Sequence, residues 1–349
     1  MSFNASLAAT AIGSFPHQDV DAVCRLVLEN FPEIPACPQL PAISLNEQME
    51  IQYSEGLPCV VIDRQKGRMY FETSGNTTSA LERFYENYLA ENLDYFALSM
   101  DFSHGIYAIE KYLNQKKPPE MKYMKMQVTG PVSFALTVVD ENKRAIYYND
   151  MFRDVIVKGI AMKARWQLRH FKSISEPRIC IIDEPILSAF GSSTYVSVSR
   201  NDVVAMICEV VEAVHAEGGL AGIHCCGNTE WTIPIDAGVD IINFDAYTYG
   251  ESILLYPEQM KSFLEGGGIL AWGIIPTSID VERETTDSLA DKLLGLVNQL
   301  ALKGIDREIV IHNSIITASC GTGSVPVDRA ERIIRETKKV SDKLKKQYL

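Results

Sequence analysis

The sequence predicts a single (β/α)8 barrel, an α/β fold in which eight parallel strands alternate with helices. Short apolar runs alternate with helical patterns along the chain, and several runs are apolar almost throughout, as strands buried on both faces are. No linker or internal repeat divides the 349 residues, a length that such barrels reach as one domain. We therefore expect one domain over residues 1–349.

Eight segments are predicted to be the barrel strands. Each is short, apolar and rich in β-branched residues, which is typical of strands in a parallel sheet. The segments are residues 8–13, 95–99, 125–129, 178–183, 220–225, 240–244, 269–274 and 309–315. An open doubly wound sheet is the alternative, but no Gly-rich phosphate loop follows the first segment, which argues against its dinucleotide-binding form.

The segments between the predicted strands show helical periodicity. Ser199 is placed to cap a helix that continues through Ala216 and ends at the pair Gly218 and Gly219. Further helices are predicted over residues 78–91, 154–171, 287–302 and 328–347. Residues 32–75, between the first two predicted strands, form a long segment that we interpret as an extension of the barrel, a small subdomain or a lid.

Charge and cysteine content limit the partners and the compartment. A net charge of −12 repels phosphate backbones and anionic lipids, so we expect neither a nucleic-acid nor a membrane partner. The N-terminus lacks a signal-peptide pattern and no apolar stretch has transmembrane length, so a cytoplasmic location is expected. The eight cysteines are then expected to be free, catalytic or metal-binding thiols.

Polar residues gather where the predicted strands end. In a barrel of this kind the active site forms at the carboxyl ends of the strands. The residues at or just after those ends are Ser14, Asp101, Thr129, Asp183 with Glu184, His224 with Cys226, Asp245, Thr277 and Cys320. We therefore expect these side chains to surround one mouth of the barrel.

A metal site is the most specific local prediction. His224 and Cys226 are two residues apart on one strand, so both point to the same face, while Cys225 points away. Imidazole and thiolate groups are good zinc ligands, and Cys320 at the end of the last strand supplies a third. The fourth position is open to Asp245, to water or to a substrate sulfur; Asp245 could equally bind substrate.

Three further positions are candidates for substrate binding or acid–base chemistry. One of Asp183 and Glu184 is expected to face the barrel interior and to bind a substrate ammonium or hold a proton; the alternative is a capping acid. Ser14 follows Gly13, which permits close approach of a substrate carboxylate, although a simple turn is also compatible. Asp101 could pair with His104 or cap a helix.

Together these motifs resemble the catalytic C-terminal barrel of the cobalamin-independent methionine synthases. The resemblance also extends to their superfamily, which includes uroporphyrinogen decarboxylase and the corrinoid-dependent coenzyme M methyltransferases. It runs from about Ala11 to Ser324 and is carried by Ile12-Gly13-Ser14-Phe15-Pro16, Ile182-Asp183-Glu184-Pro185, His224-Cys225-Cys226-Gly227-Asn228, Asp245 and Cys320. The His224–Asn228 run is also similar to the zinc motif of the coenzyme M methyltransferases.

The resemblance implies a zinc enzyme that methylates homocysteine. It places His224, Cys226 and Cys320 on the zinc ligands and Asp245 where the synthases have a zinc-binding Glu. It also implies that Ser14 contacts homocysteine and that Asp183 binds its amine.

The chain departs from the synthase pattern in three ways. The large N-terminal domain of the full-length synthases is missing, Asp replaces Glu at position 245, and Thr137 stands where a Trp that packs on folate is expected. These departures favour a methylcobamide, carried by a corrinoid protein, over methyltetrahydrofolate as the methyl donor. The uroporphyrinogen decarboxylases differ more, since residues 12–18 lack their porphyrin-binding arginines.

The sequence therefore predicts a zinc-dependent methyltransferase that acts on a small thiol, with homocysteine favoured. One alternative is a methyltransferase of the corrinoid:coenzyme M type. A metal-free lyase of the decarboxylase type is the second alternative, and a non-catalytic accessory protein that binds zinc or a corrinoid is the third.

Overall fold

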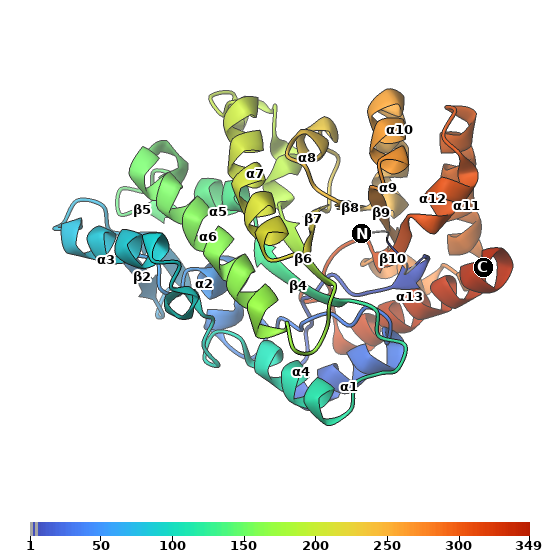
Figure 1. Ribbon diagram of the computed structural model, residues 1–349, viewed down its shortest axis with the longest axis horizontal. Helices are drawn as coiled ribbons and strands as arrows, with labels where there is room; N and C mark the ends of the chain where they lie inside the picture. Colours follow the sequence, from blue (N-terminus) through green and yellow to red (C-terminus); the bar gives the residue numbers. More distant parts are fainter. Residues whose placement is uncertain (1–2, 4–5) are drawn as a thin grey trace.

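A computed structural model of the protein describes residue 3 and residues 6–349. Among these residues, seven parallel strands form one curved sheet in the order β1-β10-β9-β8-β7-β6-β4, surrounded by helices (Figure 1). The strands are β1 (Ala8–Ala9), β4 (Met124–Thr129), β6 (Arg178–Asp183), β7 (Leu220–Cys225), β8 (Ile241–Phe244), β9 (Ile269–Ile275) and β10 (Ser314–Ala318). This architecture confirms the predicted α/β barrel class.

Residues 36–39, here called the closing segment, join the two edges of this sheet. Gln39 forms a parallel bridge with Ser14, which follows β1, and Ala36 forms one with Lys125 in β4. Backbone hydrogen bonds run from the Gln39 N–H to the Gly13 carbonyl and from the Cys37 N–H to the Lys125 carbonyl, both 2.8 Å long. The closing segment therefore occupies the eighth position of the barrel.

The strand predicted over residues 95–99 is wrong. Leu93–Phe96 form a short 3₁₀ helix, η2, whose buried side chains Leu93 and Phe96 are three residues apart and pack into the helical layer. The true eighth strand position was missed because the closing segment is short and contains Pro38, which weakens a strand signal.

A small subdomain at the left of Figure 1 is built from residues that follow the closing segment and from one strand that comes after β4 in the chain. It contains a three-stranded sheet in the order β2-β3-β5, with β2 (Val60–Asp63), β3 (Arg68–Phe71) and β5 (Val139–Asp140). Residues 32–75 thus supply both the closing segment and part of this subdomain. The predicted extension, residues 32–75, therefore includes the second strand position of the barrel, and the subdomain begins only after that position.

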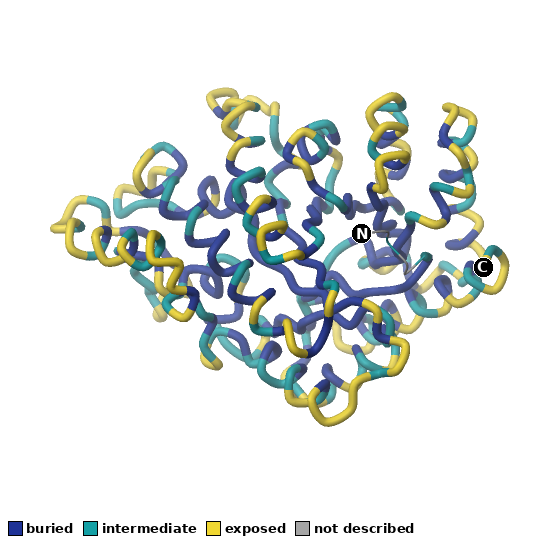
Figure 2. Tube along the Cα trace, viewed as in Figure 1, coloured by how far each residue is buried: buried dark blue, intermediate teal, exposed yellow. Residues whose placement is uncertain are grey.

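Helices cover the outside of the barrel, and Figure 2 shows buried strands at the centre with exposed helix faces outside. The longest of them match the predicted helices within a few residues. The α-helices are α1 (Val20–Asn30), α2 (Met49–Tyr53), α3 (Thr78–Leu89), α4 (His104–Gln115), α5 (Pro131–Thr137), α6 (Asp150–His170), α7 (Arg200–Ala216), α8 (Thr232–Asp236), α9 (Ala246–Tyr249), α10 (Pro257–Glu265), α11 (Thr286–Leu302), α12 (Arg307–His312) and α13 (Val327–Tyr348).

The last barrel strand begins later than predicted. The apolar residues 309–311 belong to α12, because Asp306 accepts a hydrogen bond from the Glu308 N–H and starts a helix there. β10 follows as Ser314–Ala318, so Cys320 lies two residues beyond the end of the strand. Although β10 begins later than predicted, Cys320 still lies at the rim of the barrel.

Side chains alternate between the inside and the outside of the barrel. In β6, Ile179 and Ile181 belong to the inner apolar cluster, whereas Cys180 and Ile182 pack against the helices. The same alternation directs His224, Asn243 and Thr129 inward from their strands, because their neighbours in sequence pack outward. The inner apolar layer thus gives way to polar side chains toward the carboxyl ends of the strands.

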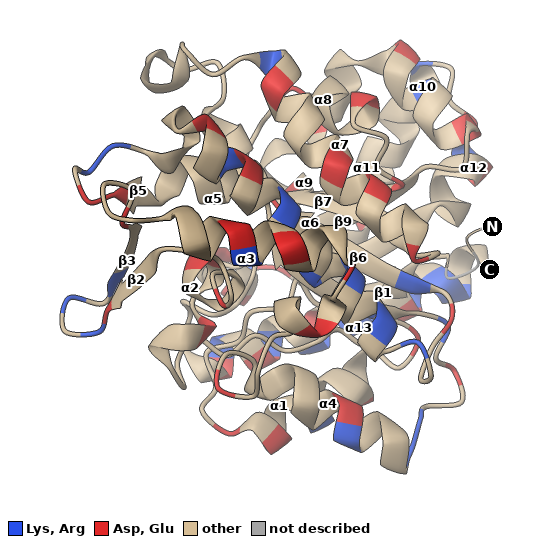
Figure 3. Cartoon of the chain, turned by 60° about the vertical axis from the view of Figure 1, so that its left-hand side comes forward, with Lys and Arg blue, Asp and Glu red and all other residues tan. Residues whose placement is uncertain are grey.

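Basic and acidic residues lie intermixed along the outer helices (Figure 3). None of the described helices combines the length and the apolar character that crossing a membrane requires.

Candidate functional site

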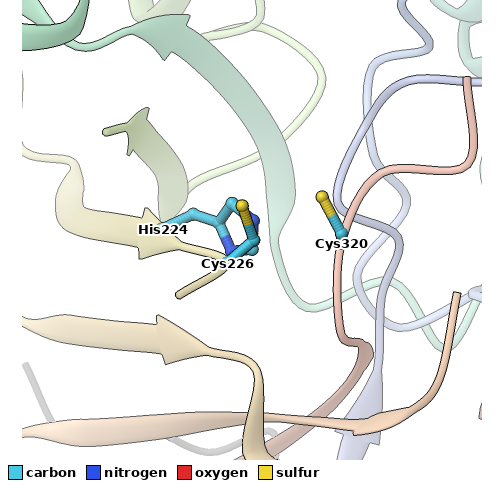
Figure 4. A group of neighbouring side chains, drawn as sticks. All are labelled: His224, Cys226 and Cys320. Carbon is cyan, nitrogen blue, oxygen red and sulfur yellow. The ribbon is translucent and has the colours of Figure 1, made fainter. Parts of the chain in front are cut away.

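The side chains of His224, Cys226 and Cys320 meet at the rim of the barrel. Their ligand atoms, one imidazole nitrogen and two sulfurs, all lie within 4.8 Å of one another. His224 and Cys226 come from the end of β7, and Cys320 approaches from the loop after β10 (Figure 4). The sheet order separates β7 and β10 by two strands, so the curvature of the barrel brings the three residues together.

The chemistry of these three residues fits a zinc ion. His224 is 4% exposed, and neither ring nitrogen has a hydrogen-bond partner within the described residues. A buried imidazole without a partner is costly, and a metal ligand accounts for one of the two nitrogens. One nitrogen and two sulfur ligands leave a fourth position open, as catalytic zinc sites do.

The two thiols of the site ionise differently. The neighbouring Cys320 thiol, followed by the His224 imidazole, lowers the pKa of the Cys226 thiol to about 4. The neighbouring Cys226, followed by burial, raises the pKa of the Cys320 thiol. The pair therefore favours a single thiolate, on Cys226.

Asp183 is the member of the Asp183–Glu184 pair that faces the barrel interior. It lies beside His224 in the strand register, and its Oδ1 is a buried acceptor without a partner among the described residues. Burial raises the pKa of Asp183 to about 6, and the opposing effects of His224 and Lys125 favour the charged form. This oxygen is placed to accept hydrogen bonds from a ligand that enters the mouth.

Glu184 points away from the mouth and holds the start of α5. Its fully buried carboxylate accepts hydrogen bonds from the Val132 N–H, the Ser133 N–H and the Ser133 hydroxyl at 2.6–2.8 Å. Burial raises its pKa to about 7, although these three donors favour the charged form. The oxygens of Glu184 are thus occupied by the start of α5, and a catalytic role for this residue stays a prediction.

Ser14 is tied to the loop that carries Cys320. Its carbonyl accepts hydrogen bonds from the N–H and the hydroxyl of Thr322 at 3.0 and 2.9 Å. A Cβ at position 321 would meet the Ser14 hydroxyl at 2.1 Å, so Gly321 is needed for this close approach. Ser14 therefore lies beside the loop that carries Cys320, and its contact with a substrate stays a prediction.

Asp245 lies outside the group of three ligand residues found among the described residues. Its Oδ1 accepts a hydrogen bond from the Thr248 N–H at 2.8 Å and caps α9. Burial raises its pKa, and the negative charge of Cys226 adds to that effect. Asp245 is thus a capping acid near the site, and its roles as a fourth metal ligand or in substrate binding stay predictions.

Two further residues face inward at the mouth: Asn243, which the sequence reasoning missed, and Thr129, which it had placed at the end of its strand. Asn243 lies beside His224 in the register, and Thr129 lies beside Asp183. Each has a buried oxygen without a partner among the described residues. The signal that could have identified Asn243 is its place two residues before Asp245 and opposite in orientation to the apolar Ile242 and Phe244.

His104 does not pair with Asp101, which is exposed. Its Nδ1 lies 2.6 Å from Oε1 of Glu47, a residue that the sequence reasoning did not consider. Asp101 is not the cap of α4 either, since the N-cap residue is Ser103.

No protein-family model matches the chain, and no curated protein matches its sequence. Among solved structures, the chain is similar to the crystal structure of a proposed fructose-1,6-biphosphate aldolase from Coccidioides immitis. The TM-score is 0.35 and the sequence identity 8%, over 98% of this chain and 91% of that chain. A likeness at this level carries no argument about function.

Proposed function

We propose that the protein is a zinc-dependent methyltransferase that moves a methyl group onto a small thiol, with homocysteine the favoured acceptor. The observation that carries the proposal is the convergence of His224, Cys226 and Cys320 within 4.8 Å at the active rim of the barrel. A site with one nitrogen ligand, two sulfur ligands and an open position is suited to take a substrate sulfur as its fourth ligand.

A free thiol has a pKa near 8.5 and is mostly protonated at neutral pH. A bound zinc ion would lower that pKa and present the thiolate at a fixed place. His224, Cys226 and Cys320 are the residues that would hold the ion.

Two other residues at the rim offer partners for the ammonium and carboxylate groups of an amino-acid thiol such as homocysteine. In this proposal the unpartnered Oδ1 of Asp183 accepts hydrogen bonds from the substrate ammonium. The hydroxyl of Ser14, beside the loop that carries Cys320, donates to the substrate carboxylate. A methyl donor, either a methylcobamide on a corrinoid protein or methyltetrahydrofolate, would approach from outside the mouth.

Zinc content tests the proposal. Elemental analysis of the purified protein is expected to give about one zinc per chain, as one three-residue site predicts. The variants Cys226→Ser and Cys320→Ser are expected to lose the metal. Cys208→Ser is the matched control, because Cys208 is a half-buried thiol on α7, outside the triad.

Zinc-loaded protein is then assayed for methylation of homocysteine with methylcobalamin or methyltetrahydrofolate. Wild-type protein that takes up no zinc even after incubation with the metal would overturn the methyltransferase proposal and favour the metal-free lyase.

A further inference from the structure

Glu47 and His104 form a carboxylate–imidazole pair that the proposed chemistry has not yet used. Glu47 is fully buried, and its Oε1 lies 2.6 Å from Nδ1 of His104 and also accepts the His104 backbone N–H at 2.9 Å. Its Oε2 accepts the Leu40 N–H at 2.8 Å. The His104 side chain remains 35% exposed.

The pair leaves one imidazole nitrogen free to exchange a proton. An ionised carboxylate can only accept hydrogen bonds, so Nδ1 of His104 carries the proton of the 2.6 Å bond. That bond fixes the tautomer and leaves Nε2, which has no hydrogen-bond partner within the described chain, as the basic nitrogen. The buried carboxylate also stabilises the imidazolium that forms when Nε2 takes up a proton.

The pair lies on the same rim as the triad. Leu40, which Glu47 holds, directly follows Gln39 at the carboxyl end of the closing segment. His104 is the first residue of α4, and α4 approaches that segment so closely that a Cβ on Gly105 would meet the Pro38 carbonyl at 1.9 Å. The loop that carries Cys320 reaches this part of the rim, since a Cβ on Gly323 would meet Cγ of Pro41 at 3.2 Å.

The hydrogen bonds between Glu47 and the backbone do not explain why the side chain at position 104 is an imidazole. Holding the Leu40 and His104 amides requires the carboxylate alone, and any residue at position 104 offers the same N–H. The imidazole adds a titratable group that is 35% exposed and oriented by a buried acid. Paired groups of this kind serve proton transfer when they lie next to a substrate.

We propose that His104 is the base that removes the proton from the acceptor thiol, and that Glu47 positions the imidazole. The inference rests on the proposed function. The S–H bond breaks with its electron pair left on sulfur, and an N–H bond forms at Nε2. The sulfur then uses that pair to bond the methyl group, the bond between the methyl group and its donor breaks with its electron pair left on the donor, and the half-exposed imidazole returns its proton to solvent.

Proton release on thiol binding tests the inference without a methyl donor. Zinc-loaded protein is mixed with homocysteine in weak buffer with a pH indicator, and the release is followed by stopped flow. In His104→Asn, whose side-chain amide can still donate to Glu47, the extent of release is expected to stay the same. The rate is expected to fall about 10²–10⁴-fold, and added imidazole is expected to restore it.

Several controls accompany this experiment. His312→Asn, at an exposed position on α12, is expected to leave the rate unchanged, and methionine, which has no thiol, is expected to release no proton. Glu47→Gln keeps an acceptor but removes the charge, so it is expected to slow the release as well. It also carries the test if His104→Asn does not fold.

The outcomes separate the two proposals. Equal rates in wild type, His104→Asn and Glu47→Gln would overturn the role of His104 as base and leave the methyltransferase proposal intact. Failure of the zinc-loaded wild type to bind homocysteine would overturn the proposed function, and the role of His104 with it.

Discussion

At the scale of single residues, Asn243 is the side chain best placed to orient His224. The two residues are neighbours in the register of β7 and β8, and Asn243 is 1% exposed. Its amide nitrogen donates to the Ala271 carbonyl and to the Thr317 hydroxyl, both at 2.9 Å, which fixes the amide and leaves Oδ1 without a partner among the described residues. A metal-bound histidine gives its second N–H to such an acceptor.

We expect Asn243→Leu to bind zinc about 10- to 100-fold more weakly, because the ring of His224 loses the acceptor that orients it. Asn243→Asp keeps an oxygen on that side and is expected to stay close to wild type. Competition with a chromophoric chelator measures the zinc dissociation constant of each variant.

Thr317→Val is the control for this prediction, since it removes one of the two partners of the Asn243 nitrogen but leaves Oδ1 in place. If Thr317→Val weakens zinc binding as much as Asn243→Leu does, the effect comes from packing of the barrel interior and the role of Asn243 as acceptor is wrong.

The residues of the site differ in how far the sequence could predict them. The inward direction of His224 and the outward direction of Cys225 follow from strand alternation, and Cys320 follows from the rule that strand ends share one rim. The partner of His104 could not be found in this way. Glu47 lies in a 3₁₀ helix, η1 (Leu45–Glu47), whose position depends on the tertiary contacts of Leu40.

At the scale of elements, α6 contains a buried amine that costs stability. Lys163 is fully buried, and its Nζ donates to the Phe96 carbonyl of η2 at 3.3 Å. Burial lowers its pKa from 10.5 to about 8, and Glu55 opposes that effect. Between these two values the unfolded chain binds more protons than the folded one, so the free energy of unfolding rises with pH across this window.

We expect Lys163→Met to stabilise the protein by about 2–3 kcal/mol at pH 7, because it removes a buried charge at the loss of one weak hydrogen bond. The difference from wild type is expected to shrink as the pH rises from about 8 to 10.5. Urea unfolding of both proteins at pH 7 and pH 10 measures it.

Lys158→Met on the same helix is the matched control. Hydrogen bonds and charges from Asp154 and Glu209 outweigh burial and raise the pKa of Lys158, so its removal is expected to bring no such gain. Equal effects of the two substitutions would contradict the assignment of the cost to burial of Lys163.

Sequence periodicity predicts some strands of this barrel and fails for others. Strands buried on both faces, such as β7 and β9, are apolar runs that the sequence identifies within one residue. The closing segment makes isolated bridges and has too few residues for a pattern, so its place in the barrel depends on its neighbours Ser14 and Lys125. The apolar residues 309–311 fit a strand or a helix equally well, and the Asp306 cap decides for the helix.

At the scale of the whole molecule, a metal ion at the triad would join distant parts of the barrel. Cys226 follows β7 and Cys320 follows β10, and two strands lie between them in the sheet. The folded chain presents the three ligands together, whereas the unfolded chain does not. An ion that binds only the folded state stabilises it by about 4 kcal/mol at a free concentration 1,000 times its dissociation constant.

We therefore expect a chelator to lower the melting temperature of the zinc-loaded protein by about 5 °C, given the unfolding entropy of a chain of this size. Calorimetry with and without chelator measures the shift. Cys208→Ser keeps the triad and is expected to show the full shift, whereas Cys320→Ser is expected to show none. If the chelator shifts Cys320→Ser as much as wild type, the ion acts elsewhere on the molecule and does not link β7 to β10.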